Sequence, residues 1–274
     1  MTPGADRRVN RQARRVDRRL GLTQSGWTVA ILVALLLYVE LGSRLGWIDS
    51  FLVPPLSSDA ANAVKLLVSA TFWQAHLFPT LFAVFLSFII AVIVGLMVGF
   101  LIWRVRLVRM ILDPWLAIYY AIPIFALYPL LVVIMGVGLM PIVFIASSMA
   151  VVAVITATVD ALDSIPKTVL KLAHSLDMSV GQCILKIYVP GALNQITVGL
   201  RLALSFSIIG TLASEFILST RGMGYFISYE SEHFDMASMY GAIVLMLLLA
   251  VGINAIFGFW MRVRTQRIFG DHQD

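Results

Sequence analysis

The chain contains few residue types that perform chemistry. It has one cysteine, Cys183, in 274 residues, which excludes an internal disulfide and a cysteine-built metal site. Its four histidines (His76, His174, His233 and His272) lie outside the middle of the apolar stretches, and no GxSxG or HExxH motif occurs. A Walker-type GxxxxGK[ST] motif is also absent, so ATP chemistry has no phosphate-binding loop here. The sequence therefore predicts no catalytic, cofactor-binding or metal-binding residue.

Charge is scarce as well. Only 13% of the residues are charged, whereas 60% are hydrophobic. This balance is typical of a polytopic helical membrane protein and not of a soluble domain. The net charge of +5 comes from segments beside the apolar stretches, so it does not indicate nucleic-acid binding. We predict an all-α membrane protein that contacts lipid and binds no nucleic acid.

Apolar stretches long enough to cross a bilayer recur along the chain. A helix needs about 20 apolar residues to span the hydrocarbon core. Six candidates occur, near residues 27–47, 78–102, 111–137, 139–162, 195–219 and 237–261. The third is the least regular because prolines 114, 123 and 129 interrupt helical hydrogen bonding. The sequence thus predicts six transmembrane helices in a membrane domain over residues 27–262.

The basic residues orient these spans. Most of the 20 Lys and Arg fall in residues 1–26, in the loop after the second span, in the polar segment 163–190 and in the tail 263–274. Because short cytoplasmic loops carry the excess of positive charge, both termini and the polar segment are predicted to be cytoplasmic. Apolar residues within 1–26 recur at helical spacing, which fits an amphipathic helix on the leaflet surface or a tail that only orients the chain.

The polar segment 163–190 lies between the fourth and fifth spans and predicts two short helices. Pro166 fits a first helical turn. One apolar face follows, formed by Val169, Leu172, Ala173 and Leu176. Ser179 and Gln182 have the spacing of a capping box for a second helix, which Pro190 and Gly191 are expected to stop. A short helix with one apolar face fits a groove on a partner protein, or packs beneath its own bundle.

Four segments together resemble the inner-membrane permease subunits of binding-protein-dependent ABC importers, and the nitrate/sulfonate/taurine-type permeases in particular. The family's cytoplasmic loop reads Glu-Ala-Ala, three residues, Gly, then aliphatic-x-aliphatic-Pro. Here those places hold Lys171-Leu172-Ala173, Asp177 and Ile187-Tyr188-Val189-Pro190. The other three segments are the proline-punctuated residues 121–130, the motif Gly199-Leu200-Arg201, and Glu215 followed by Gly222-Met223-Gly224-Tyr225. Three of these places depart from the family pattern: Lys171 stands for Glu, Leu172 for the first Ala and Asp177 for Gly.

The resemblance implies a half-transporter in a bacterial inner membrane. Two permeases, here expected to be a homodimer, form the pathway. A cytoplasmic ABC ATPase dimer binds ATP and Mg²⁺, and an extracytoplasmic binding protein delivers the substrate. The residues implied in ATPase coupling are Lys167, Leu170, Lys171, Leu172, Ala173, Leu176, Asp177 and Pro190. Those implied in the translocation pathway are Pro123, Pro129, Ser147, Ser207, Thr211 and Glu215.

Two questions stay open at this point. The substrate implied is a small anion of the nitrate, sulfonate or taurine type, or a small heterocycle such as a thiamine precursor. The alternative function is an ion-coupled secondary transporter, which would normally place carboxylates near the bilayer centre. The ionisable residues within the spans, Glu40, Asp160, Arg201 and Glu215, lie near span ends instead, which favours the importer.

Overall fold

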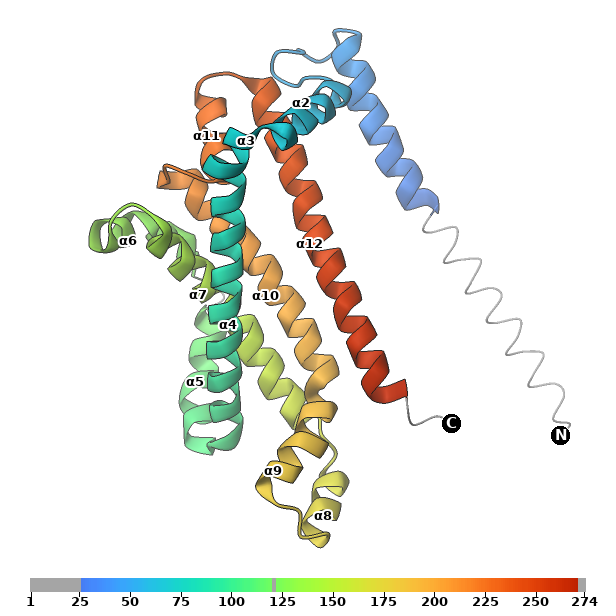
Figure 1. Ribbon diagram of the computed structural model, residues 1–274, viewed down its shortest axis with the longest axis vertical. Helices are drawn as coiled ribbons and strands as arrows, with labels where there is room; N and C mark the ends of the chain where they lie inside the picture. The colour runs from blue at the N-terminus through green and yellow to red at the C-terminus, as the bar shows by residue number, and fades with distance from the viewer. Residues whose placement is uncertain (1–25, 120–121, 271–274) are drawn as a thin grey trace, which may run out of the picture.

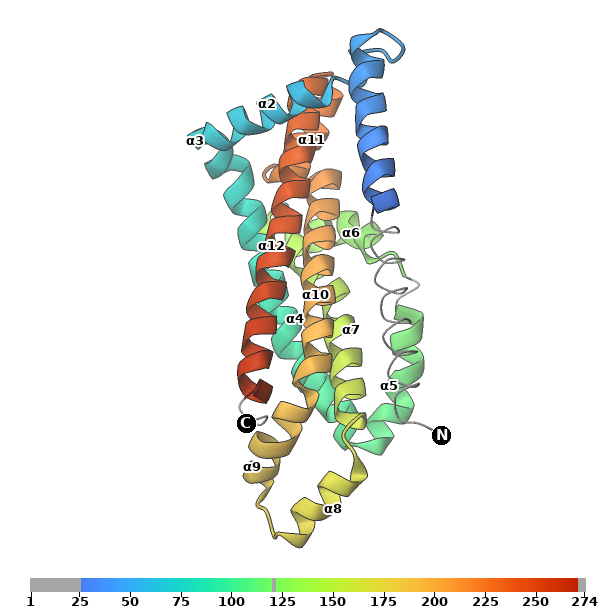
Figure 2. The same ribbon diagram turned by 90° about the vertical axis from the view of Figure 1, so that its right-hand side faces the viewer.

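The computed structural model describes residues 26–119 and 122–270, and within these ranges the secondary structure is helical, without strands. Four long helices run side by side along the length of the molecule (Figure 1, Figure 2). They are α4 (Phe78–Arg104), α7 (Leu139–Asp163), α10 (Val189–Leu218) and α12 (Met236–Gly270). The all-α architecture predicted from the composition is therefore confirmed.

Short helices mark the two ends of this bundle (Figure 1). The α8 end carries α8 (Lys167–Ser175) and α9 (Val180–Cys183). The opposite end, called here the α11 end, carries α2 (Leu56–Val68), α3 (Ala70–Phe72) and α11 (Met223–Glu232). The segment 163–190 thus projects beyond the long helices as a hairpin of short helices.

Five continuous helical stretches have the length and composition to cross a membrane. They are Gly26–Arg44, Ala70–Arg104, Leu139–Asp163, Gly181–Ile217 and Met236–Met261. These stretches correspond to five of the six predicted spans. The first stands apart from the bundle in both views, and most of its side chains are exposed. Residues 1–25, where the basic leader was predicted, lie outside the described residues.

The third predicted span, 111–137, is not a single continuous helix, in line with the prolines that interrupt it, so the count of six spans stays a prediction. The segment forms α5 (Arg106–Tyr119), a 3₁₀ turn η2 (Ile124–Leu127) and α6 (Tyr128–Met135). Pro123 precedes η2 with a non-helical ψ of 81°, and proline has no N–H to continue a helical hydrogen-bond ladder. Pro129 lies in the first turn of α6, where a missing donor is tolerated.

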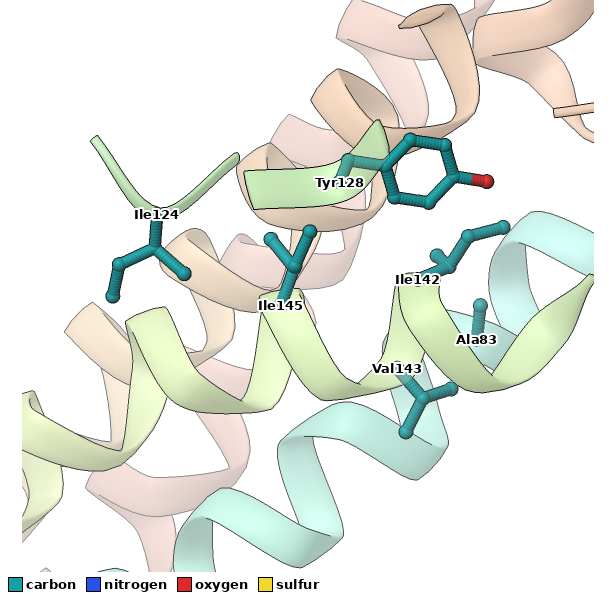
Figure 3. Close-up of a cluster of buried hydrophobic side chains, with 6 residues drawn as sticks. All are labelled: Ala83, Ile124, Tyr128, Ile142, Val143 and Ile145. Carbon is teal, nitrogen blue, oxygen red and sulfur yellow. The ribbon is translucent and has the colours of Figure 1, made fainter. Parts of the chain in front are cut away.

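Buried apolar side chains hold the broken segment against the bundle (Figure 3). Ile145 of α7 points toward the η2–α6 segment and lies between Ile124 and Tyr128. Ala83 of α4 completes the same cluster. At the other end of the segment, Arg109 of α5 forms an ion pair with Asp163 at the end of α7, with 2.8 Å between Nη1 and Oδ2. The segment is therefore anchored to α7 at two places.

Helix α7 is the centre of the bundle, because its membrane-spanning window is the most buried of the five. Glycines bring α4 and α10 close to it. A Cβ at Gly99 of α4 would lie 2.7 Å from the Cβ of Thr158, and one at Gly210 of α10 would lie 2.8 Å from the Cα of Ala146. Small residues permit such close approach between membrane helices. Helices α4, α7 and α10 therefore form one tightly packed unit.

One predicted helix boundary was wrong. Pro190 and Gly191 do not stop a helix, because α9 continues through a π-helical turn, η3 (Ile184–Tyr188), directly into α10. The wider π turn accommodates a proline whose missing N–H would break a regular α-helical ladder. Helix α12 continues to Gly270, so the tail expected from residue 263 is helical as far as it is described.

Candidate functional site

The hairpin at the α8 end is the first candidate site. Helix α8 begins after Pro166, whose carbonyl accepts hydrogen bonds from the amides of Val169 and Leu170 at 3.0 and 3.5 Å. Leu170 faces inward, where it packs against a cluster built on Ala161, Leu162, Ile165 and Ala192. Ala173 is only 4% exposed. The inward side of α8 is therefore occupied by this chain itself.

Apolar side chains also lie on the side of α8 that points away from the bundle. Val169 is 39% exposed, Leu172 is 59% exposed and Leu176, just beyond the helix, is 65% exposed. Their spacing of three and four residues places them on one side of the helix. The predicted docking face included Ala173, whose burial removes it from the free surface. The apolar surface available to a partner is thus Val169, Leu172 and Leu176, called here the α8 stripe.

The turn after α8 explains one departure from the family pattern. Asp177 has a φ of +46°, which is the left-handed region that glycine adopts freely and that Asp tolerates better than most residues. The amide of Met178 donates to the Ala173 carbonyl at 3.1 Å and closes the helix end. Asp177 therefore occupies the conformation for which the family pattern has glycine.

The predicted capping box at the start of α9 is confirmed. The Ser179 amide donates to the Gln182 side-chain oxygen at 2.9 Å, and the Gln182 amide donates to Ser179 Oγ at 3.3 Å. Both ends of the turn between α8 and α9 are therefore fixed by hydrogen bonds. Lys167 and Lys171 are exposed beside the α8 stripe, and Pro190 lies in the first turn of α10.

The predicted pathway residues gather around α10. Ser207, Thr211 and Glu215 are each buried and follow one another at intervals of four residues, so they share one side of the helix. Ser147 is buried on α7, next to Ala146, which meets Gly210 of α10. The two prolines, Pro123 and Pro129, instead flank η2 in the middle of the broken segment, between α5 and α6. Whether these residues line a pathway stays a prediction.

Glu215 is the centre of a buried polar network. Its carboxylate is 2% exposed and accepts a hydrogen bond from the Thr80 hydroxyl of α4, with oxygen distances of 2.9 and 2.8 Å. Its Oε2 also accepts from the Gly224 amide at 3.0 Å. The Met223 amide donates to Thr80 Oγ1 at 2.8 Å. The Glu215 network, defined by Glu215, Thr80, Met223 and Gly224, therefore joins α4, α10 and the start of α11.

The turn before α11 fits closely over this carboxylate. Gly222 has a φ of +104°, and a Cβ at this position would collide with the Glu215 carboxylate. The Gly222 amide donates to the Ala75 carbonyl at 3.2 Å, and the Gly222 carbonyl lies 3.1 Å from Nδ1 of His76. Sequence reasoning missed Thr80 and His76. The only signal was that a carboxylate in an apolar span requires buried donors.

Two of the cavities that border α10 have several polar lining residues. One of about 480 Å³ lies at the α11 end beside Glu215, and its polar lining includes Gln74, Ser219 and Arg221. The other, of about 460 Å³, lies between α7 and α10, and its polar lining residues are Thr156, Asp160, Asn194 and Gln195. Within the described residues no group of three or more His, Cys, Asp or Glu is arranged to hold a metal ion. The two cavities offer hydrogen-bonding groups to a polar solute.

A bundle of membrane-spanning helices with polar cavities and a projecting helical hairpin defines a membrane transport subunit. The chain belongs to the family of binding-protein-dependent transport system inner membrane components, whose pattern matches residues 91–270. It is a multi-pass permease subunit of an ABC importer, as the sequence predicted.

Relatives and solved structures agree with this assignment. A probable ABC transporter permease of Haemophilus influenzae is 28% identical over 81% of this chain and 89% of its own length. The taurine transport system permease of Escherichia coli is 29% identical over 69% of this chain and 70% of its own. An inward-facing structure of the MetNI methionine ABC transporter covers 72% of this chain and 99% of that chain, with a TM-score of 0.62 and 19% identity, which shows the shared fold.

Proposed function

We propose that this permease couples to a separate cytoplasmic ATPase through the α8 stripe. The supporting observation is that Val169, Leu172 and Leu176 are exposed at the end of the bundle, on and just after a short helix that projects beyond the long helices. Exposed apolar side chains at three- and four-residue spacing fit a groove on a partner protein. The neighbouring cations Lys167 and Lys171 would meet acidic or polar groups at the rim of that groove.

The connections of α8 explain how movement of a partner would reach the membrane. Residues 163–166 join α8 to α7, and α9 and η3 join it to α10. On its inner side Leu170 packs against Leu162 of α7 and Ala192 of α10. A displacement of α8 therefore shifts the ends of both helices that flank the cavity containing Asp160. This arrangement supports alternating access driven by ATPase closure.

The partners follow from the family. We propose an ABC ATPase dimer that binds ATP and Mg²⁺, a second copy of this chain forming a homodimer, and an extracytoplasmic binding protein at the α11 end. The chain would lie in a bacterial inner membrane with both termini and the α8 end in the cytoplasm. The basic residues beside the span ends support this orientation.

For the substrate we propose a small heterocycle first. The cavity near the α8 end has one carboxylate and two carboxamides but no cation among its described lining residues, which disfavours a plain anion. Relatives of this chain include a riboflavin permease of Chloroflexus aurantiacus and a formylaminopyrimidine permease of Halalkalibacterium halodurans. A small sulfonate of the taurine type is the second candidate, because Arg221 lines the outer cavity and a taurine permease is also a relative.

The coupling role is tested by the double variant Leu172→Glu, Leu176→Glu in the full chain. Two carboxylates on the α8 stripe should abolish ATPase co-purification and ATP-driven uptake in proteoliposomes, because they would be buried unpaired at the contact. Lys167→Ala is the matched control on the same helix and should retain most of both activities. Full association of the double variant with the ATPase would refute the proposal. Uptake by the chain alone, without an ATPase, would favour an ion-coupled secondary transporter instead.

A further inference from the structure

Arg201 lies on α10 where this helix meets α12, close to the α8 end. A Cβ built at Gly258 of α12 would collide with the Arg201 guanidinium, so this group lies directly against the α12 backbone at the glycine. Gly258 is three residues before the end of the last predicted span, 237–261, which Arg262 and Arg264 follow in the sequence. At 1.5 Å per residue the guanidinium is therefore about 5 Å inside that end of the span. This is the depth at which lipid headgroups meet the hydrocarbon core.

The guanidinium has no protein partner in the described part of the chain. Its Nε is buried and has no hydrogen-bond acceptor. The ion pairs that the structure shows are made by Arg44 and Arg109 and do not include Arg201. A cation at this depth is costly unless an anion or water satisfies it. Among the described residues, the two helices therefore hold a charged donor without an anionic partner.

A cavity of about 410 Å³ opens beside this guanidinium, lined by Arg201, Asn254, Ala255, Gly258 and Phe259. Asn254 is fixed within it, because its side-chain oxygen accepts from Ser205 Oγ at 3.2 Å and its amide donates to the Ala250 carbonyl at 3.0 Å. One proton of that amide remains available to a ligand. The polar floor of the cavity thus presents donors and no carboxylate among its lining residues.

The surroundings of the cavity are apolar and exposed. Phe259 and Ala255 lie one turn apart on α12, and Phe259 is 72% exposed. Ile256, which follows Ala255 on α12, is likewise 72% exposed. A soluble anion would gain nothing from these side chains, whereas acyl chains would pack on them. The combination of an unpaired guanidinium with an apolar rim selects an amphiphile.

We propose that this cavity binds the phosphate of an anionic phospholipid headgroup in the leaflet at the α8 end. The planar guanidinium donates two parallel hydrogen bonds to phosphate oxygens, and Asn254 supplies a further donor. The acyl chains lie along the exposed side of α12 at Ile256 and Phe259. In the orientation proposed above this is the cytoplasmic leaflet, which carries anionic lipid. The bound lipid bridges α10 and α12.

The test uses the purified full chain in phosphatidylcholine nanodiscs that contain a minor fraction of phosphatidylglycerol. Native mass spectrometry after release into detergent counts the phosphatidylglycerol retained per chain. Arg201→Gln should lower the affinity for this lipid by about tenfold or more, the effect of losing a charge-assisted hydrogen bond. Arg104→Gln removes an exposed cation from the same end of the bundle and should leave retention unchanged.

Further variants keep the test decisive. Gly258→Leu retains the charge but fills the cavity, so it should also release the lipid, and a size-exclusion profile like that of the wild type shows that each variant is folded. Equal retention by the wild type and Arg201→Gln would overturn the proposal. Displacement of the lipid by inorganic phosphate at millimolar concentration would also overturn it, since the cavity would then be a site for a soluble anion. The measurement involves neither ATPase nor transport, so its result is independent of the proposed coupling role.

Discussion

Removal of the Thr80 hydroxyl is the sharpest test of the Glu215 network. Thr80→Val keeps the shape of the side chain but deletes a hydroxyl that donates to Glu215 and accepts from the Met223 amide. A typical hydrogen bond between membrane helices contributes about 0.6 kcal/mol. Here the variant leaves the buried Met223 amide without its acceptor, at a cost of about 1–3 kcal/mol. Glu215 keeps the Gly224 amide and loses one donor, at a cost of about 1 kcal/mol. We therefore expect a loss of about 2–4 kcal/mol in the free energy of unfolding.

The assay is denaturation of the purified chain by SDS in mixed micelles, followed by the loss of helical circular dichroism. Thr158→Val is the control, because Thr158 is also buried but its hydroxyl donates only to the Val154 carbonyl of its own helix. The control should lose less than about 1 kcal/mol. A Thr80→Val protein within about 0.5 kcal/mol of the wild type would show that the Glu215 network does not hold α4 to α11.

Two further predictions concern positions outside the membrane. Burial, and secondarily the negative charge of Glu40, raise the pKa of Asp59 to about 6 from its usual value near 3.8, and its Oδ1 has no partner among the described residues. The folded chain therefore binds this proton more tightly than the unfolded chain, and stability contributed by the protonated form is lost as the pH rises from about 4 through 6. Asp59→Asn should raise the melting temperature at pH 8 and have little effect at pH 5, and an equal shift at both pH values would contradict this. Asp177→Val should lower stability by about 1–2 kcal/mol because a β-branched residue is strained at positive φ, whereas Asp177→Gly should be neutral or stabilising. Thermal unfolding of the two variants should separate them, and similar losses in both would refute a role for the backbone conformation.

Short-range sequence patterns predicted those parts of the fold that depend on interactions between residues close together in the chain. Five of the predicted spans correspond to helices that are long and apolar enough to cross a membrane. They could be predicted because this property depends only on the length and hydrophobicity of each stretch. The capping box at Ser179 and Gln182 formed as expected, because its two hydrogen bonds join residues only three apart. The third stretch is broken at Pro123, one of the three prolines at which the sequence predicted an interruption. Pro190 was misread because a π turn accommodates it within a continuous helix.

The sites were predicted less completely, and for a different reason. Helix α8 has apolar residues on two sides, and the sequence does not indicate which side its own bundle covers. Ala173 was therefore assigned to the docking face although it is buried. The partner of Glu215 is 135 residues away, on another helix. Such a contact depends on the packing of α4 against α7 and α10, which no short-range pattern records.

The most direct test of the account is affinity purification of this chain from native membranes, followed by mass spectrometry of the co-eluting proteins. If the α8 stripe binds an ABC ATPase, this ATPase should co-elute in stoichiometric amount with the wild-type chain. It should be lost from the Leu172→Glu, Leu176→Glu variant. A chain that elutes without an ATPase, under detergent conditions that preserve other ABC importers, would contradict the account.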